Sequence, residues 1–323
     1  MRVGVYSDSL PKLGRRDLLK WCAERGVSDI EIGVGAWGPW PRPHLDFATV
    51  GRPVERDRLA GELREFGIRL AAVNAAGNLL HPDPAKRKDA QVRFDAAVDL
   101  AVALGVKRVI TMSGCPAGPG GGSLGVFPCW ATSADDERIF DWQMQNEVGP
   151  FWKATSERLA GVDPELIVCL ELHPGVTVFT AASFEALLPY IGRNIGLNMD
   201  PSHFWWQGID PLAAVRYLGP QGAIFHVHAK DTFINEAVCA TTSLLENGPM
   251  ADVPARAWSY ITLGYGHDER WWRSYCYRLR MNGYDGWLSI EHEDVVLSRV
   301  EGVRRSVELL KLVAPVEASD YAP

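Results

Sequence analysis

The chain has 323 residues, and 47% of them are hydrophobic, which is enough for one large core or two small ones. Its formal net charge is -7 with basic residues scattered along the sequence, so neither DNA nor another polyanion is expected as the main partner. The composition indicates no membrane span or signal peptide, and the six cysteines show no Cys-x-x-Cys spacing, so we expect a cytoplasmic protein with reduced thiols.

Short apolar segments alternate with segments of helical periodicity along the whole chain. The predicted strands are residues 3–8, 28–34, 69–75, 107–113, 166–172, 195–200, 223–229 and 286–292. The predicted helices lie near residues 16–25, 54–66, 85–104, 135–160, 182–192, 211–217, 268–281 and 297–313. This alternation is typical of parallel βαβ units. Eight units in a chain of this length predict an α/β fold, a single (β/α)8 TIM barrel domain over residues 1–323.

Three connections are longer than such barrels usually need: residues 35–52, 114–134 and 230–267. Each follows a predicted strand, which places it on the C-terminal face, where barrel active sites are built. We expect these long loops to form walls or lids of a pocket. Subunit contacts are the alternative, and for residues 230–267 the two interpretations stay equally open.

Histidines gather at the carboxyl ends of the predicted strands or just beyond them. The eight are His44, His81, His173, His203, His226, His228, His267 and His292. Four acidic residues stand beside them, namely Glu171, Asp200, Asp231 and Glu291. Carboxylates and imidazoles are costly to bury without partners, so their recurrence in apolar strands indicates a shared partner, most simply a divalent metal.

Four of these residues end the last four predicted strands in order: Glu171, Asp200, His228 and Glu291. Three carboxylates and one imidazole make an oxygen-rich site of hard to borderline character. We therefore predict that these four side chains bind one divalent metal. Mn²⁺ is favoured, with Mg²⁺, Co²⁺ and Zn²⁺ as alternatives.

Four motifs carry a resemblance to a known family. They are Leu-Glu171-Leu-His-Pro, Asp200-Pro-Ser-His203, His226-Val-His228-Ala-Lys-Asp231 and Ile-Glu291-His. They resemble the xylose-isomerase-like barrel superfamily, which includes sugar-phosphate isomerases, ketose epimerases, inosose-handling enzymes and apurinic endonucleases. The resemblance covers nearly the whole chain and implies the same four ligands. It also implies that His203 contacts substrate or joins a second metal.

The number of metals separates branches of that superfamily. The resemblance implies three metal ions for the endonuclease branch. Those ions are bound in part by extra histidines from earlier strands and by an Asp-x-His pair after the seventh strand. Here the second and third predicted strands end in Gly35 and Asn74-Ala-Ala-Gly-Asn78, and no Asp-x-His pair follows His228. The sequence therefore favours a single ion.

We predict that residues near the predicted ligands bind the substrate or orient a ligand. The candidate substrate-binding residues are His173, His203, Lys230, His81 and Trp37, and the candidates for orienting His228 are His226 and Asp231. Lys230 could neutralise a carboxylate or hold an oxyanion. His44 and His81 could equally be exposed loop histidines. His267 follows a Gly-Tyr-Gly turn that either binds an oxyanion or is a simple turn.

The predicted chemistry is proton abstraction next to a carbonyl. A metal that chelates a carbonyl and its neighbouring hydroxyl stabilises the enediolate, and Glu171 and Glu291 are the candidate bases. A sugar or cyclitol isomerase or epimerase is the leading hypothesis, and the sequence does not choose between the two reactions. Lyases that cleave 3-oxo-glycosides by β-elimination are the close alternative. An abasic-DNA phosphodiesterase and a catalytically silent scaffold rank below it.

The expected partners follow from the same hypothesis. Trp37 and the other tryptophans of the active-face loops can stack on sugar rings or pack subunits together. We expect a small carbohydrate substrate, no nucleic acid and no membrane. A homo-oligomer or a partner subunit is compatible with the sequence.

Overall fold

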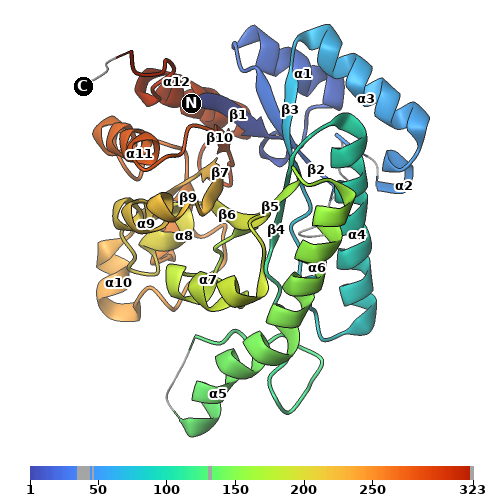
Figure 1. Ribbon diagram of the computed structural model, residues 1–323. Coiled ribbons are helices and arrows are strands. Elements are labelled where there is room, and N and C mark those ends of the chain that lie inside the picture. Colours follow the sequence, from blue (N-terminus) through green and yellow to red (C-terminus); the bar gives the residue numbers. More distant parts are fainter. Residues whose placement is uncertain (35–43, 46, 130–132, 321–323) are drawn as a thin grey trace. The chain divides into compact units, whose positions relative to one another are not determined.

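The computed structural model describes residues 1–34, 44–45, 47–129 and 133–320 (Figure 1). Eight parallel strands form a closed barrel in the order β1-β10-β7-β6-β5-β4-β3-β2. They are β1 (Arg2–Tyr6), β2 (Asp29–Gly33), β3 (Arg69–Asn74), β4 (Arg108–Met112), β5 (Ile167–Glu171), β6 (Ile195–Met199), β7 (Ile224–Ala229) and β10 (Trp287–Ile290). Each begins and ends within two residues of its prediction, so the predicted (β/α)8 barrel is confirmed.

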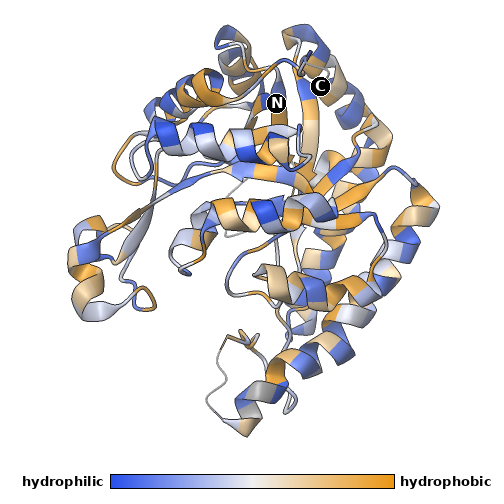
Figure 2. Ribbon diagram, turned by 60° about the vertical axis from the view of Figure 1, so that its left-hand side comes forward, coloured by the Kyte–Doolittle hydropathy of each residue, from blue (hydrophilic) through white to orange (hydrophobic). Residues whose placement is uncertain are grey.

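Helices follow the strands in chain order, and in Figure 2 they carry both hydrophilic and hydrophobic residues, as expected for helices with one buried face. The longer ones are α1 (Arg15–Glu24), α3 (Pro53–Phe66), α4 (Pro84–Leu104), α5 (Ala134–Gln143), α6 (Gly149–Val162), α7 (Ala181–Leu187), α9 (Pro211–Leu218), α11 (Glu269–Met281) and α12 (Arg299–Val313). Met144–Val148 forms a π-helical turn between α5 and α6. Among the described helices, none is long and apolar enough to cross a membrane.

Short helical segments lie in the connections. They are η1 (Ser7–Ser9), α2 (Phe47–Val50), η3 (Leu188–Tyr190), α8 (Ser202–Trp205), η4 (Gly219–Gln221), α10 (Glu236–Thr242) and η5 (Val253–Ala255).

Local sequence sets the ends of the helices, and α4 illustrates how. The Asp83 carboxylate accepts hydrogen bonds from the backbone N–H groups of Ala85 and Lys86, at 2.8 and 3.3 Å, which caps the amino end. Gly105 ends the helix with a φ of 68°, in the left-handed region that glycine adopts at little cost. The predicted helix near residues 85–104 is therefore confirmed, and its two caps explain where it begins and ends.

The long connection predicted at residues 230–267 contains an antiparallel hairpin that the sequence analysis did not predict. Its strands are β8 (Asp231–Ile234) and β9 (Trp258–Ile261). Thr232 pairs with Tyr260 in this hairpin. The hairpin matters for the site because it brings Tyr260 back beside the end of β7.

The chain divides into two compact units. The first comprises Met1–Glu31, Glu65–Arg69 and Met199–Pro323, and the second comprises Ile32–Arg64 and Leu70–Asn198. In the first unit, β10 pairs with β1 and β7, and Trp272 and Tyr275 of α11 are fully buried. In the second, β4 pairs with β3 and β5, and buried Trp152 donates a hydrogen bond to the Ser113 carbonyl (2.9 Å). A single domain over residues 1–323 stays a prediction.

Candidate metal centre

Three predicted ligands lie at strand ends of the first unit. Asp200 directly follows β6, His228 is the penultimate residue of β7, and Glu291 directly follows β10. Their ligand atoms all lie within 4.8 Å of one another. Asp200 and His228 are almost wholly buried, and 18% of the Glu291 side chain is exposed. The structure therefore brings two carboxylates and one imidazole together, as the sequence predicted.

The two carboxylate oxygens of Asp200 have different surroundings. Its Oδ1 accepts a hydrogen bond from the Ser202 backbone N–H at 2.8 Å. Among the described residues, no donor makes a hydrogen bond to the buried Oδ2, although Lys230 Nζ and His203 Nε2 lie 3.2 and 3.3 Å away as ion-pair partners. A buried carboxylate oxygen in this state suits coordination of a metal ion.

Lys230 is the ammonium group of this cluster. Its Nζ lies 2.8 Å from Glu291 Oε2, 3.2 Å from Asp200 Oδ2 and 3.3 Å from Glu293 Oε2. It also lies 4.5 Å from the centre of the Tyr260 ring. Three carboxylates thus surround one ammonium group, and the resulting excess of negative charge suits a divalent cation.

The ionisation of these groups follows from burial and charge. Burial would lower the pKa of Lys230, but the charges of Asp200, Glu291 and Glu293 raise it well above its usual range. Burial would raise the pKa of Glu291, but the charge of Lys230 and the neighbouring His228 lower it. For Asp200 burial prevails and raises the pKa, against the lowering effect of Lys230.

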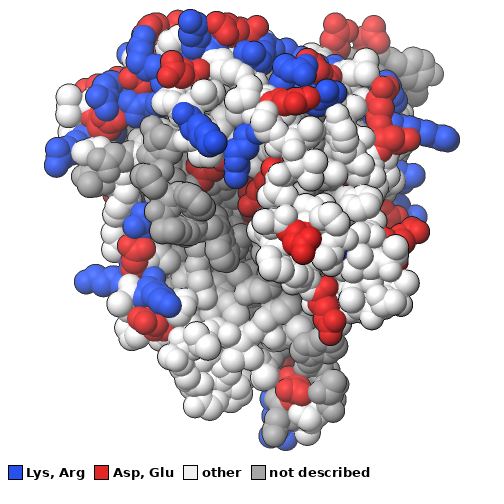
Figure 3. Space-filling view, turned by 180° about the vertical axis from the view of Figure 1, so that it is seen from behind, with Lys and Arg blue, Asp and Glu red and all other residues white. Residues whose placement is uncertain are grey.

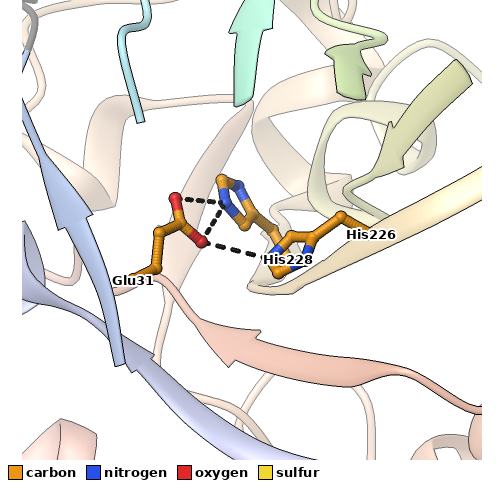
Figure 4. Close-up of side chains that lie close together, drawn as sticks. All are labelled: Glu31, His226 and His228. Carbon is orange, nitrogen blue, oxygen red and sulfur yellow. Dashed lines mark hydrogen bonds and ion pairs between the residues drawn. The ribbon is translucent and has the colours of Figure 1, made fainter. Parts of the chain in front are cut away.

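Glu31, Glu293 and Tyr260 belong to this region, and the sequence analysis did not identify them. Glu31 of β2 is buried and accepts hydrogen bonds from His226 and His228 (Figure 4). The signal for Glu31 was present, because it stands in the apolar strand Asp-Ile-Glu-Ile-Gly just as the predicted ligands stand in theirs. Tyr260 could be found only through the pairing of β8 with β9.

His203, a predicted substrate-binding residue, lies in the short helix α8. Its Nε2 is 3.3 Å from Asp200 Oδ2, and its Nδ1 is 3.0 Å from the Tyr260 hydroxyl. Both ring nitrogens therefore face polar groups of the cluster.

Asp231 accepts several hydrogen bonds from the segment 264–272. Its oxygens accept hydrogen bonds from the backbone N–H groups of Gly264 (3.1 Å) and His267 (3.0 Å), from His267 Nδ1 (2.8 Å) and from Trp272 Nε1 (3.3 Å). The His267 ring stacks on Trp205 with centroids 3.8 Å apart. These donors belong to residues 264–272, so the contacts of Asp231 give no support to its predicted role of orienting His228.

The other predicted residues lie in the second unit or outside the described chain. Glu171 ends β5, is buried, and accepts a hydrogen bond from Asn198 Nδ2 at 3.4 Å. His173 Nδ1 lies 2.5 Å from the Pro174 carbonyl oxygen. His81 Nδ1 accepts a hydrogen bond from the Asp83 N–H at 3.0 Å, and its side chain lines a hollow of about 430 Å³. Their predicted roles stay predictions.

Two further residues complete the account. His44 is buried, so the alternative of an exposed loop histidine is wrong for this residue. Trp37 lies outside the described residues.

Comparisons with known proteins agree with this fold. The uncharacterized protein YfiH of Bacillus subtilis (strain 168) is 34% identical over 318 residues, which are 96% of this chain and 98% of YfiH. The crystal structure of the IolI protein with a binding zinc atom has a TM-score of 0.66 at 17% identity, and the match covers 97% of this chain and 98% of the IolI chain.

A third protein with the same fold is the 3-keto-D-glucoside 4-epimerase YcjR from E. coli. Its TM-score is 0.65 at 13% identity, with 97% of this chain and 99% of the other covered. At such low identities the two solved structures show a shared fold. The model of the xylose isomerase-like TIM barrel family matches residues 19–313. With this match and the extended identity to YfiH, the chain belongs to the xylose isomerase-like TIM barrel family.

Proposed function

We propose that this protein is a metal-dependent isomerase or epimerase that acts on a free or lightly modified sugar or cyclitol by removing a proton next to a carbonyl. The observation that carries the proposal is the convergence of Asp200, His228 and Glu291, whose ligand atoms lie within 4.8 Å of one another. The zinc atom in the IolI structure, a protein of the same fold, supports a metal at such a centre.

The ion is proposed to bind Glu171, Asp200, His228 and Glu291. Glu171 enters as the fourth ligand because it ends β5, next to β6 in the barrel, as Asp200 and His228 mark the ends of β6 and β7. Three carboxylates and one imidazole favour Mn²⁺, while Mg²⁺, Co²⁺ and Zn²⁺ can use the same donors. When bound, the ion would polarise the substrate carbonyl and lower the pKa of the neighbouring C–H group.

Glu171 and Glu291 are proposed to remove and return the proton. Each is a carboxylate at the carboxyl end of its strand, β5 for Glu171 and β10 for Glu291, which is the type of group that can act as a general base. Return of the proton to the other face of the same carbon gives an epimer. Delivery to the adjacent carbon gives aldose–ketose isomerisation.

Lys230 and His203 are proposed to hold the oxygens of the substrate. Lys230 keeps its charge beside Glu291 and Asp200, so its ammonium group can stabilise a developing oxyanion. His203 is oriented by the Tyr260 hydroxyl 3.0 Å away and can contact a substrate hydroxyl. His173, His81 and Trp37 are proposed as further substrate contacts.

The surface charge is compatible with a small substrate. On the face seen in Figure 3, Lys and Arg side chains lie interspersed with Asp and Glu, as the net charge of -7 implies. A face with mixed charges of this kind gives no reason to expect a polyanion as its partner.

A lyase that cleaves 3-oxo-glycosides is the second candidate. The name of YcjR gives it a glucoside with a ketone at C3, which is the functional group that β-elimination requires. The same base could remove the proton at C2 of such a glycoside, and the electron pair would then expel the aglycone from C1. The ketone oxygen would again face the ion and Lys230.

Proton exchange separates the two candidates. The protein, loaded with Mn²⁺, is incubated with ketoses, inososes and 3-oxo-glycosides in D₂O, and after removal of Mn²⁺ the products are analysed by NMR. Deuterium incorporation without aglycone release supports the isomerase or epimerase, whereas release supports the lyase. The Glu291→Gln variant and EDTA-treated protein serve as controls, and loss of a general base is expected to slow exchange by about 10²-fold or more.

Metal content tests the rest of the proposal. Elemental analysis should find one divalent ion per chain in the active protein. Three zinc ions per chain would support the endonuclease alternative, and full activity of Glu291→Gln or of the metal-free protein would refute the proposed mechanism.

A further inference from the structure

Glu31 of β2 accepts hydrogen bonds from three side chains inside the first unit (Figure 4). His226 Nε2 lies 3.1 Å from Oε2, and His228 Nε2 lies 3.1 Å from Oε1 and 3.2 Å from Oε2. Ser289 Oγ donates to Oε2 at 2.8 Å. Glu31 is 1% exposed and the two histidines are 0% exposed, so these bonds replace the water that the carboxylate has lost.

These contacts fix which nitrogen of His228 carries its proton. An ionised carboxylate can only accept hydrogen bonds, so His228 must present an N–H group at Nε2. In the neutral imidazole the lone pair that can bind a metal is then on the other nitrogen, Nδ1. Nδ1 is the atom that lies 3.2 Å from Glu291 Oε2, on the side of the candidate metal ligands.

The packing around the ring supports the same orientation. The Tyr6 ring stacks over His228 with centroids 5.9 Å apart and an interplanar angle of 14°. His226 meets His228 edge to face at 5.7 Å. A ring held in this way cannot turn over to exchange its two nitrogens without breaking the contact with Glu31.

The rival interpretation treats Glu31, His226 and His228 as a metal site of their own, since their ligand atoms also lie within 4.8 Å of one another. The three pairs of atoms already have hydrogen-bond distances of 3.1 to 3.2 Å, and Ser289 supplies a further donor that a metal-bound carboxylate would not need. A neutral His228 also offers only one lone pair, so it can serve only one of the two sites.

We infer that Glu31 is a positioning residue that directs His228 to bind the divalent ion through Nδ1, with His226 and Ser289 holding the Glu31 carboxylate in place. The inference rests on the proposed metal site and adds a residue and an atom to it. A carboxylate that accepts the far N–H of a metal-bound imidazole orients the ring and raises its basicity, and loss of such a partner typically weakens metal binding about 10–100-fold.

The first experiment needs no variant. Protein labelled with ¹⁵N is loaded with Zn²⁺, and long-range ¹H–¹⁵N correlation spectra report the state of each imidazole nitrogen, with His228 assigned by comparison with His226→Gln. We expect a metal-bound Nδ1 and a protonated Nε2 for His228. A metal-bound Nε2 would overturn the inference whatever the variants do.

The second experiment measures Mn²⁺ binding by calorimetry for the wild type, Glu31→Gln and the control Glu55→Gln, which removes a buried carboxylate that pairs with Arg58. We expect a Kd about 10–100-fold weaker for Glu31→Gln and an unchanged Kd for the control. Equal Kd values for all three would refute the role of Glu31 and leave the metal site intact.

Other outcomes remain distinct. A wild type that binds no Mn²⁺ would overturn both this inference and the proposed function. Two ions per chain, with one lost in Glu31→Gln, would establish the rival metal site instead. If Glu31→Gln does not fold, Ser289→Ala takes its place, because it removes one hydrogen-bond donor to Glu31. The inference would then be refuted if the Kd of Ser289→Ala for Mn²⁺ were unchanged and if His228 of the wild type bound the metal through Nε2.

Discussion

The Lys230 ammonium group lies 2.8 Å from Glu291 Oε2, and only 3% of the Lys230 side chain is exposed. The pair is therefore an ion pair inside the protein, with Asp200 and Glu293 as additional anionic neighbours of the lysine. Removal of one partner from a buried ion pair leaves the other charge uncompensated, which is far more costly than the loss of a surface pair.

Substitution of Lys230 by Met should lower the free energy of unfolding of the metal-free protein by about 3–5 kcal/mol. Added Mn²⁺ should recover part of this loss, because a divalent ion supplies the missing positive charge. Urea unfolding with and without Mn²⁺ measures both effects. Lys107→Met is the matched control: Lys107 pairs with Asp163 and Glu165 at the surface, where solvent screens the charges, so a much smaller loss of stability is expected. Equal losses in the two variants would contradict the prediction.

Gly302 of α12 has no room for a side chain. A methyl group there would overlap His292 and lie 2.7 Å from Thr262 Oγ1, whose hydroxyl donates to Asp294 at 2.7 Å. Gly302→Ala should therefore lower the free energy of unfolding by about 1–3 kcal/mol. Gly161 of α6 has no atoms within 4 Å of such a methyl group, so Gly161→Ala should be neutral or stabilising by up to about 1 kcal/mol. A Gly302→Ala variant as stable as Gly161→Ala would show that the crowding is absent.

The contacts of Asp231 predict that its substitution lowers the stability of the protein but leaves metal binding unchanged. Asp231→Asn places an amide N–H₂ group among N–H donors of residues 264–272, so unfolding should become easier by about 2–4 kcal/mol. The Kd for Mn²⁺ should change less than twofold. A variant of normal stability that binds Mn²⁺ tenfold more weakly would instead support the role of orienting His228.

Thiol reactivity should follow burial. Burial raises the pKa of Cys22 and Cys276 to about 12 and that of Cys115 to about 11, so at pH 8 these groups are almost entirely in the unreactive thiol form. The thiolate fraction grows as pH rises towards the pKa, so a raised pKa moves reactivity to higher pH. Exposed Cys129 should react first with iodoacetamide in the folded protein, as measured by peptide mapping. Labelling of Cys22 as fast as Cys129 would refute this order, and protein in guanidinium provides the fully reactive control.

The strands could be predicted because each is a short apolar run bounded by polar residues. The convergence of Asp200, His228 and Glu291 could be predicted because each is a polar residue at the end of such a run. Glu31 was missed because it stands in the middle of its apolar strand rather than at the end, and its partners, His226 and His228, are 195 and 197 residues away. Tyr260 was missed because the pairing of β8 with β9 cannot be derived from two strands of four residues each.

The role of Asp231 in orienting His228 stays a prediction, but the direction of its side chain is informative. His226, His228 and Lys230 alternate along one extended segment, so their side chains share a face, whereas Asp231 is the next residue and points away. The sequence analysis grouped Asp231 with its neighbours by distance along the chain. The two-residue period of extended backbone assigns it to the loop at residues 264–272 instead.

The two ends of the β8–β9 hairpin differ in their relation to the candidate metal cluster. Its paired base fixes Tyr260 beside Lys230 and His203, while residues 235–257 at its far end make no part of the candidate metal cluster. Insertions, deletions and substitutions at that end can therefore accumulate during divergence without changing the residues of the candidate metal cluster.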